Sequence, residues 1–269
     1  MSEAYYLFCI TSNDLIDGDS LGYGLADGQP LIKVTVGDLA AIVSMVSLED
    51  YAGPGAEERL NNVEWITPRA LRHGQVIQEI TELAPTLPTS FGVLFSSRQK
   101  VISLLESNYK AIAGFLEMIR DKEEWAIKAY LDRNKLKNLL FQQRVEKAGA
   151  TLSELSPGVK YFKEKQILAE VEKEIASWLD GKIDRIAGGL TAISAQLLAR
   201  KNVKLAFDEN ENELVANWAI LTEIADFEKM SEQISKMNMD PDLDGLELKL
   251  SGPWPPYSFA PSLEMEIEK

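Results

Sequence analysis

Two residues of this chain could form a nucleophilic catalytic pair, because it has one cysteine, Cys9, and one histidine, His73. A thiolate beside an imidazole can attack an electrophile while the imidazole acts as its base. Cys9, however, lies inside the apolar run AYYLFCI, where a buried cysteine is usually an inert packing residue. A single cysteine excludes an internal disulfide, and one cysteine with one histidine excludes a zinc site built from these residue types. The pattern favours core packing over catalysis, and the catalytic hypothesis is tested by replacing His73.

The remaining motifs that could bind a ligand or catalyse a reaction are incomplete. The segment Asp240–Gly245, DPDLDG, is similar to the first half of a calcium-binding loop, but Ser251 stands where a bidentate glutamate is needed. The tripeptide GYG lacks the rest of the dinucleotide fingerprint and precedes a predicted strand instead of following one. Glu123 and Glu124 are adjacent, so they would face opposite sides of a strand. The sequence therefore predicts no enzyme, no cofactor and no metal site, and DPDLDG is interpreted as a solvated turn.

The charge of the chain is strongly negative and unevenly distributed. The net charge is −14, and residues 208–269 contain 15 acidic residues against 4 lysines. Five Lys or Arg residues gather within Arg133–Lys147, where a solvated helix face is expected. Overall acidity argues against nucleic-acid binding, which requires neutralisation of phosphates. No apolar run reaches the ~20 residues of a membrane span, and no basic segment precedes the apolar N-terminus, so we expect a cytoplasmic protein without membrane insertion.

The predicted fold class is α+β with two domains, since 269 residues exceed the usual size of one domain. Residues 1–121 are predicted to form a mixed α/β domain. Thr67 is the expected N-cap of its first long helix, with Pro68 at the first helical position. The expected elements are a strand at 4–10, a hairpin of strands 31–36 and 39–47 turning at Gly37-Asp38, a helix at 67–84, an extended segment at 84–95 and one helix at 97–120.

Residues 122–250 are predicted to form a second domain with a different order of elements. The expected order is a strand at 124–132, a helix to Lys147, a long helix that glycines could kink, a hairpin of strands 203–207 and 214–221, a helix capped by Asp226 and a strand at 246–250. Gly252-Pro253 is expected to end that last strand. This β-α-β-β-α-β order, with a doubled first crossover, is the ferredoxin-like order.

Two segments combine aromatic residues with prolines, which remove backbone donors and stiffen the chain. They are LPTSFGVLF (87–95) and LSGPWPPYSF (250–259). Two interpretations stay open: a rigid apolar platform for a partner, or irregular core packing. For the tail, residues 251–269, we expect packing against the N-terminal domain near LPTSFGVLF, locking the two domains together; the alternative is that the tail itself binds a partner. The candidate residues are Phe91, Phe95, Trp254, Tyr257 and Phe259.

Four motifs give the chain a family resemblance that covers nearly its whole length. LPTSFGVLF, EEWAIKAY (123–130), PGVKYFKEK (157–165) and, most specifically, LSGPWPPYSF are similar to segments of the gas vesicle protein F/L family. The N-terminal aromatic strand and His73 ahead of the LP motif also fit. One departure concerns Thr89 and Ser90, which occupy positions where family members often carry an arginine.

The resemblance implies a non-enzymatic gas vesicle accessory protein without cofactors, whose C-terminal domain is ferredoxin-like. It further implies a minor vesicle component or assembly factor in the cytoplasm or at the gas vesicle. Its expected partner is the small hydrophobic shell protein, which it would keep from aggregating during vesicle nucleation. The alternative is a scaffold that binds other gas vesicle accessory proteins and not the shell subunit.

Overall fold

The computed structural model describes residues 3–14, 21–25, 28–53, 55–153, 155–202 and 212–264. The chain divides into two compact units. Unit 1 consists of Met1–Glu123 together with Trp254–Lys269, and unit 2 consists of Glu124–Pro253. The elements form a mixed α+β structure with one sheet in each unit. Within these residues, no helix is both long and apolar enough to cross a membrane.

The sheet of unit 1 has the strand order β2-β3-β1-β4, and β5 also pairs with β1. The β2–β3 hairpin turns at Gly37, whose φ of +56° suits glycine, which confirms the predicted turn. A register shift between Leu7 and Cys9 places a bulge in the middle of β1, so the neighbours Phe8 and Cys9 belong to the same core. The strands are β1 (Glu3–Ser12), β2 (Ile32–Val36), β3 (Leu39–Ser47), β4 (Thr86–Pro88) and β5 (Leu94–Phe95).

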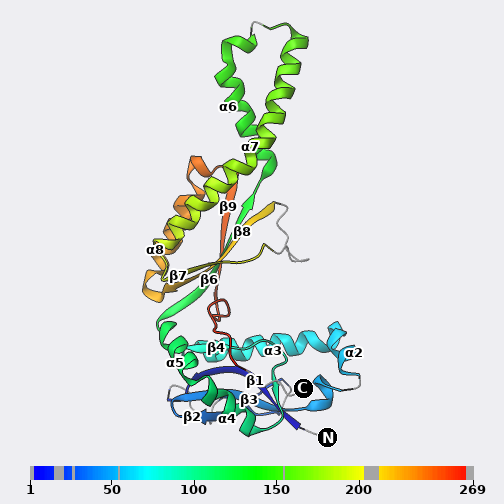
Figure 1. Ribbon diagram of the computed structural model, residues 1–269, viewed down its shortest axis with the longest axis vertical. Coiled ribbons are helices and arrows are strands. Elements are labelled where there is room, and N and C mark those ends of the chain that lie inside the picture. The colour runs from blue at the N-terminus through cyan, green and yellow to red at the C-terminus, as the bar shows by residue number, and fades with distance from the viewer. Residues whose placement is uncertain are drawn as a thin grey trace. The chain divides into compact units, whose positions relative to one another are not determined.

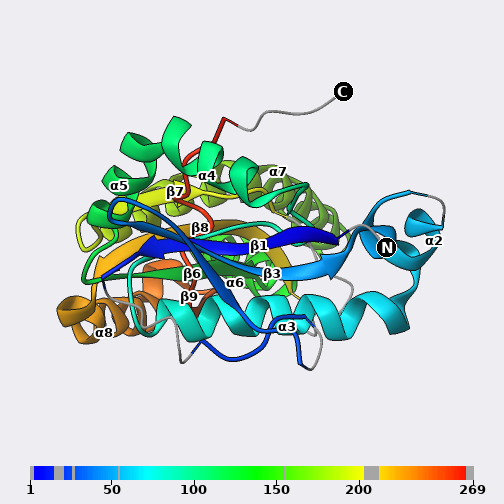
Figure 2. The same ribbon diagram turned by 90° about the horizontal axis from the view of Figure 1, so that it is seen from below.

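Helices cover both faces of this sheet, as Figure 2 shows for α3 on one side of β1 and β3 and for α4 and α5 on the other. Helix α3 buries Val76, Ile77 and Ile80 in one core with Tyr6 and Phe8 of β1. The helices are α1 (Leu48–Tyr51), α2 (Ala56–Asn61), α3 (Val63–Thr81), α4 (Arg98–Ser107) and α5 (Tyr109–Met118).

The predicted boundaries of two helical segments in unit 1 were wrong. Helix α3 begins at Val63, because the side chain of Asn62 accepts the backbone N–H groups of Glu64 and Trp65 at 2.9 and 3.2 Å. Pro68 therefore lies inside the helix instead of at its first position. The helix expected over 97–120 is two helices, since the backbone departs from helical geometry at Asn108.

The sheet of unit 2 has the strand order β7-β8-β6-β9 and one apolar face covered by helices α7 (Pro157–Thr191) and α8 (Phe227–Asn238). Ile175, Ile186 and Leu190 of α7 pack there with Met230 and Ile234 of α8. A Cβ at Gly189 of α7 would lie 2.4 Å from the Met237 methyl group of α8, so the end of the Met237 side chain packs directly over this glycine. The elements are β6 (Lys122–Leu131), β7 (Gln196–Ala199), β8 (Glu213–Glu223), α8 (Phe227–Asn238) and β9 (Leu246–Trp254).

Two strand predictions in this unit need comment. The expected strand 203–207 lies outside the described residues; β7, which precedes it along the chain, pairs antiparallel with β8. Strand β9 does not end at Gly252-Pro253 but continues to Trp254. Gly252 has a φ of +139°, and a Cβ there would lie 3.0 Å from the Trp125 ring, so only glycine fits without strain.

Helices α6 (Arg133–Ser153) and α7 (Pro157–Thr191) form an antiparallel hairpin in unit 2. Its connected ends extend well beyond the sheet, while the later half of α7 lies along it (Figure 1). The helix α7 is continuous through Gly181, Gly188 and Gly189, so these glycines do not interrupt it. In α6, by contrast, the backbone departs from helical geometry at Gly149.

Candidate functional site

His73 lies at the centre of a buried hydrogen-bond chain in unit 1. Its Nε2 is 3.0 Å from the backbone oxygen of Thr89, which can only accept, so Nε2 carries the proton. Its Nδ1 is 3.0 Å from the Tyr6 hydroxyl, which donates to it and itself accepts the N–H of Gly92 at 3.1 Å. Burial lowers the pKa of His73, although its bond to the Thr89 carbonyl acts in the opposite direction. The imidazole is thus held neutral with both nitrogens occupied.

This chain of bonds fastens the LPTSFG segment to both β1 and α3. The Thr89 hydroxyl adds bonds to the backbone oxygens of Leu7 and Phe8, at 2.9 and 2.8 Å. Phe91 contacts the rings of Tyr6 and His73 edge-on, with centroids 5.9 and 5.7 Å apart. Phe91 is half-buried in this cluster, so most of its apolar surface serves packing.

Cys9 does not form the nucleophilic pair considered from the sequence. Its side chain is fully buried, and burial raises the pKa of the thiol. Both ring nitrogens of His73 are bonded to Tyr6 and Thr89, so neither is available to deprotonate the thiol. A protonated thiol and an occupied imidazole give these two residues a packing role.

Of the predicted tail, residues 251–269, the part from Trp254 onward belongs to unit 1, whereas residues 251–253 belong to unit 2. Pro255 and Pro256 are buried. Farther along, the Asn108 side chain makes two bonds to the backbone of Glu264, accepting its N–H at 2.8 Å and donating to its carbonyl at 2.9 Å. Asn108 also donates to the Leu104 carbonyl, so one buried amide ends α4 and holds the tail.

The five candidate residues have different environments. Phe95 lies on β5 opposite Tyr5 of β1 and is half-buried, as is Phe259 in the tail. Trp254 is 50% exposed and Tyr257 is 44% exposed. Burial, with a smaller contribution from Cys9, raises the pKa of Tyr257 to about 12. The Tyr257 hydroxyl is therefore poorly solvated while much of the residue remains at the surface.

The acidic candidates are occupied by ion pairs. Arg185 contacts Asp240 at 2.5 Å and Asp242 at 3.2 Å, and Lys135 pairs with Asp244, so the DPDLDG carboxylates have cationic partners already. In the part of the chain that the structure describes, no group of three or more His, Cys, Asp or Glu could hold a metal ion.

Sequence patterns did not single out Tyr6, Asn108 or the ion pair between buried Glu124 and half-buried Arg200. A tyrosine in a core strand and an asparagine in an apolar helical stripe were the available signals, because both need buried hydrogen-bond partners. The partners themselves lie 67, 156 and 76 residues away along the chain. Local patterns carry no information over such separations.

Comparison with known proteins gives matches to gas vesicle proteins over nearly the whole chain. A family model described as gas vesicle synthesis protein GvpL/GvpF matches residues 4–261. Gas vesicle protein L of Streptomyces sp. is 25% identical over 246 residues, which cover 90% of this chain and 87% of that protein. Gas vesicle protein L1 of Halobacterium salinarum is 23% identical over 281 residues, covering 98% and 92% of the two chains.

Crystal structures of the gas vesicle protein GvpF from two cyanobacteria share the fold. The protein from Anabaena superposes with a TM-score of 0.68 at 15% identity, covering all of both chains. The protein from Microcystis aeruginosa gives a TM-score of 0.65 at 15% identity, covering 96% of this chain and 99% of the other. At this level of identity the likeness concerns the fold alone.

Proposed function

Because the chain belongs to the gas vesicle synthesis protein GvpL/GvpF family, we propose that it binds the small hydrophobic shell protein of the gas vesicle and keeps it from aggregating during nucleation. It acts in the cytoplasm or at the growing vesicle. The single observation that carries the proposal is the pair of exposed aromatic residues, Trp254 and Tyr257, on a tail whose neighbouring prolines are buried. Such a pair supplies apolar contact area at a low cost in conformational entropy.

The fixation of the tail favours a binding role for these two residues. Trp254 ends a regular strand, and the bonds from Asn108 to Glu264 hold the far end of the tail. Aromatic residues between two fixed points are already ordered before a partner arrives, so little entropy is lost on binding. Phe91 and Phe95, which are half-buried, would support the surface from within.

The charge of the molecule fits a protein that handles an apolar partner. A complex with a hydrophobic subunit exposes additional apolar surface, which promotes association between complexes. A net charge of −14 provides mutual repulsion that opposes it. Solubility of the complex would then come from this chain and not from the shell subunit.

We infer that the protein is not an enzyme and that unit 2 is a ferredoxin-like domain. The first inference is supported by the engagement of His73 and the protonated state of Cys9. The second is supported by the sheet order β7-β8-β6-β9, in which the first and third strands along the chain occupy the centre.

The proposal is tested by co-expressing the chain with the shell protein and measuring how much shell protein stays soluble and co-purifies. We expect Trp254→Ala with Tyr257→Ala to lower that amount at least about fivefold, because both contacts are truncated. A matched control is Val63→Ala with Met239→Ala, which removes exposed apolar side chains elsewhere and should change little. Equal recovery with both variants, or co-purification of other accessory proteins without shell protein, would contradict the proposal.

A further inference from the structure

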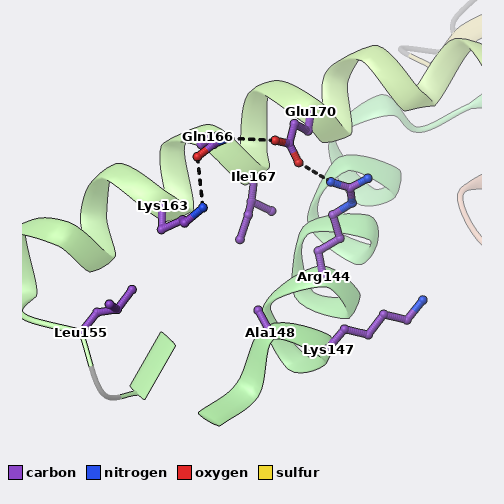
Figure 3. Close-up of a pocket in the computed structure, with 8 residues that line it drawn as sticks. All are labelled: Arg144, Lys147, Ala148, Leu155, Lys163, Gln166, Ile167 and Glu170. Atoms are coloured by element: carbon purple, nitrogen blue, oxygen red, sulfur yellow. Dashed lines mark hydrogen bonds and ion pairs between the residues drawn. The ribbon is translucent and has the colours of Figure 1, made fainter. Parts of the chain in front are cut away.

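The α6–α7 hairpin carries a groove that the proposed function does not use. Its volume is about 430 Å³. Arg144, Lys147 and Ala148 line it from α6, and Figure 3 shows the Ala148 and Ile167 side chains between the two helices. The full lining is Arg144, Lys147, Ala148, Leu155, Lys163, Gln166, Ile167 and Glu170.

The groove has a preformed shape because ion pairs join its two walls. Arg144 of α6 contacts Glu170 of α7 at 2.6 Å and also pairs with Glu174. Two turns before Arg144 on α6, Lys137 contacts Glu172 of α7 at 2.9 Å. On α7, Gln166 donates to Glu170 and accepts from Lys163 (Figure 3). These contacts fix the spacing of the helices without filling the groove.

Large apolar side chains extend the groove toward the connected ends of the helices. Val159 is 50% exposed and lies one turn before Lys163 on the same face of α7. Phe162 is 73% exposed and lies one turn before Gln166. Val159 to Ile167 spans about two turns, or about 12 Å of helix. An exposed apolar strip that is continuous with a groove is a feature of interaction sites.

The strip is bordered by positive charge although the whole chain is negative. Lys147 on α6 and Lys163 on α7 have no carboxylate partner among the residues that the structure describes. Lys160 lies on the same stretch of α7, and the Lys165 Nζ lies 5.1 Å from the centre of the Tyr161 ring. The only acidic residue in the segment 155–165 is Glu164. Cations on both walls favour an occupant with negative charges along its two sides.

We propose that the α6–α7 groove binds an acidic amphipathic α-helix of a partner protein. A groove between two antiparallel helices fits the ridge of a third helix, whose apolar stripe would contact Ile167, Val159 and Phe162. Acidic residues flanking that stripe would pair with Lys147 and Lys163. The groove lies between two helices and is concave, which disfavours a flat membrane surface as the occupant.

This surface is distinct from the one proposed for the shell protein, and the two can fail independently. The groove residues lie in unit 2, whereas Trp254 and Tyr257 belong to unit 1. If the chain bound the shell protein but not an acidic helix, the groove proposal would fail and the proposed function would stand.

The test uses the full chain and a fluorescein-labelled synthetic helix of about six turns, with leucine along one stripe and glutamate on both sides. We expect saturable binding by fluorescence anisotropy that weakens as salt is raised, because exposed charge pairs are screened. Lys147→Glu with Lys163→Glu should weaken binding at least about tenfold, since two attractions become repulsions. Circular dichroism checks that the variant remains folded.

Charge exchange makes the result decisive. A second peptide with lysine in place of every glutamate should bind the Lys147→Glu, Lys163→Glu variant better than the unaltered chain. Phe162→Ala should weaken binding of the acidic peptide. Met239→Ala, which truncates an exposed residue elsewhere, should leave that binding unchanged. Equal affinity of both peptides, no effect of the substitutions, or binding only to vesicles containing phosphatidylserine would overturn the proposal.

Discussion

At the scale of single residues, His73 joins the Tyr6 hydroxyl of β1 to the Thr89 carbonyl through hydrogen bonds. His73→Leu would leave the Tyr6 hydroxyl without an acceptor for its proton, and the Thr89 carbonyl without the donor Nε2–H, in a buried site. We expect the free energy of unfolding to fall by about 2 to 4 kcal/mol, because buried unsatisfied polar groups are costly. Urea denaturation measures it. Leu71→Ala, at an exposed position of the same helix, should stay within about 0.5 kcal/mol of the unaltered chain.

The same residue predicts a dependence of stability on pH. The folded-state pKa of His73 lies below its ordinary value, so the unfolded chain binds its proton first as pH falls. The contribution of His73 is fully present above its unfolded pKa of about 6.5 and is lost as pH drops below it. The difference in unfolding free energy between the unaltered chain and His73→Leu should therefore shrink from about pH 7.5 to about pH 5.5. Since the chain has no other histidine, a constant difference would show that His73 does not titrate on unfolding.

At the scale of elements, Asn108 couples the α4–α5 junction to the tail. Asn108→Ala removes both bonds to Glu264 and should expose the tail to proteolysis, with a loss of about 1 to 3 kcal/mol in unfolding free energy. A chain ending at Pro261 lacks the partner of these bonds. In that shortened chain, Asn108→Ala should lower the free energy of unfolding by less than in the full chain. The difference between the two losses is the coupling energy between Asn108 and the end of the tail. An equal loss of unfolding free energy in the full-length and the shortened chain would show that the Asn108–Glu264 bonds do not stabilise the tail.

Glycines of the second unit provide a matched pair of substitutions. Gly252→Ala forces a side chain into positive φ and against Trp125, so we expect a loss of at least about 1 kcal/mol. Gly181→Ala lies in the continuous helix α7 with open space around it and should stabilise the protein by about 0.5 to 1 kcal/mol. Thermal unfolding of the two variants measures both shifts, and shifts of the same sign would contradict this explanation.

Elements whose signals are local could be predicted from the sequence, and those decided by distant contacts could not. The hairpin at Gly37-Asp38 follows from a turn pair between two apolar runs. The start of α3 was misplaced because Asn62 offered a competing cap upstream of Thr67-Pro68. At the site, the exposed Trp254 and the half-buried Phe91 both lie in segments that combine aromatic residues with proline and glycine, and this pattern does not indicate which of them is packed.

At the scale of the whole molecule, the two surfaces proposed to bind partners lie in different units. The exposed aromatic pair lies on the tail of unit 1, and the lysine-bordered strip lies on the hairpin of unit 2. Two surfaces of different chemistry suit a protein that holds an apolar subunit while contacting a charged partner. Each surface can be altered alone, so their contributions to vesicle formation are separable by experiment.

The most direct measurement replaces Tyr257 with a photo-crosslinking phenylalanine analogue in cells that are forming gas vesicles. Mass spectrometry then identifies the cross-linked peptides, with the same analogue at the exposed position Val63 as the control. The account predicts cross-links from position 257 to the shell protein, and none above background from position 63. Cross-links from position 257 only to other accessory proteins, or equal shell-protein cross-links from both positions, would contradict it.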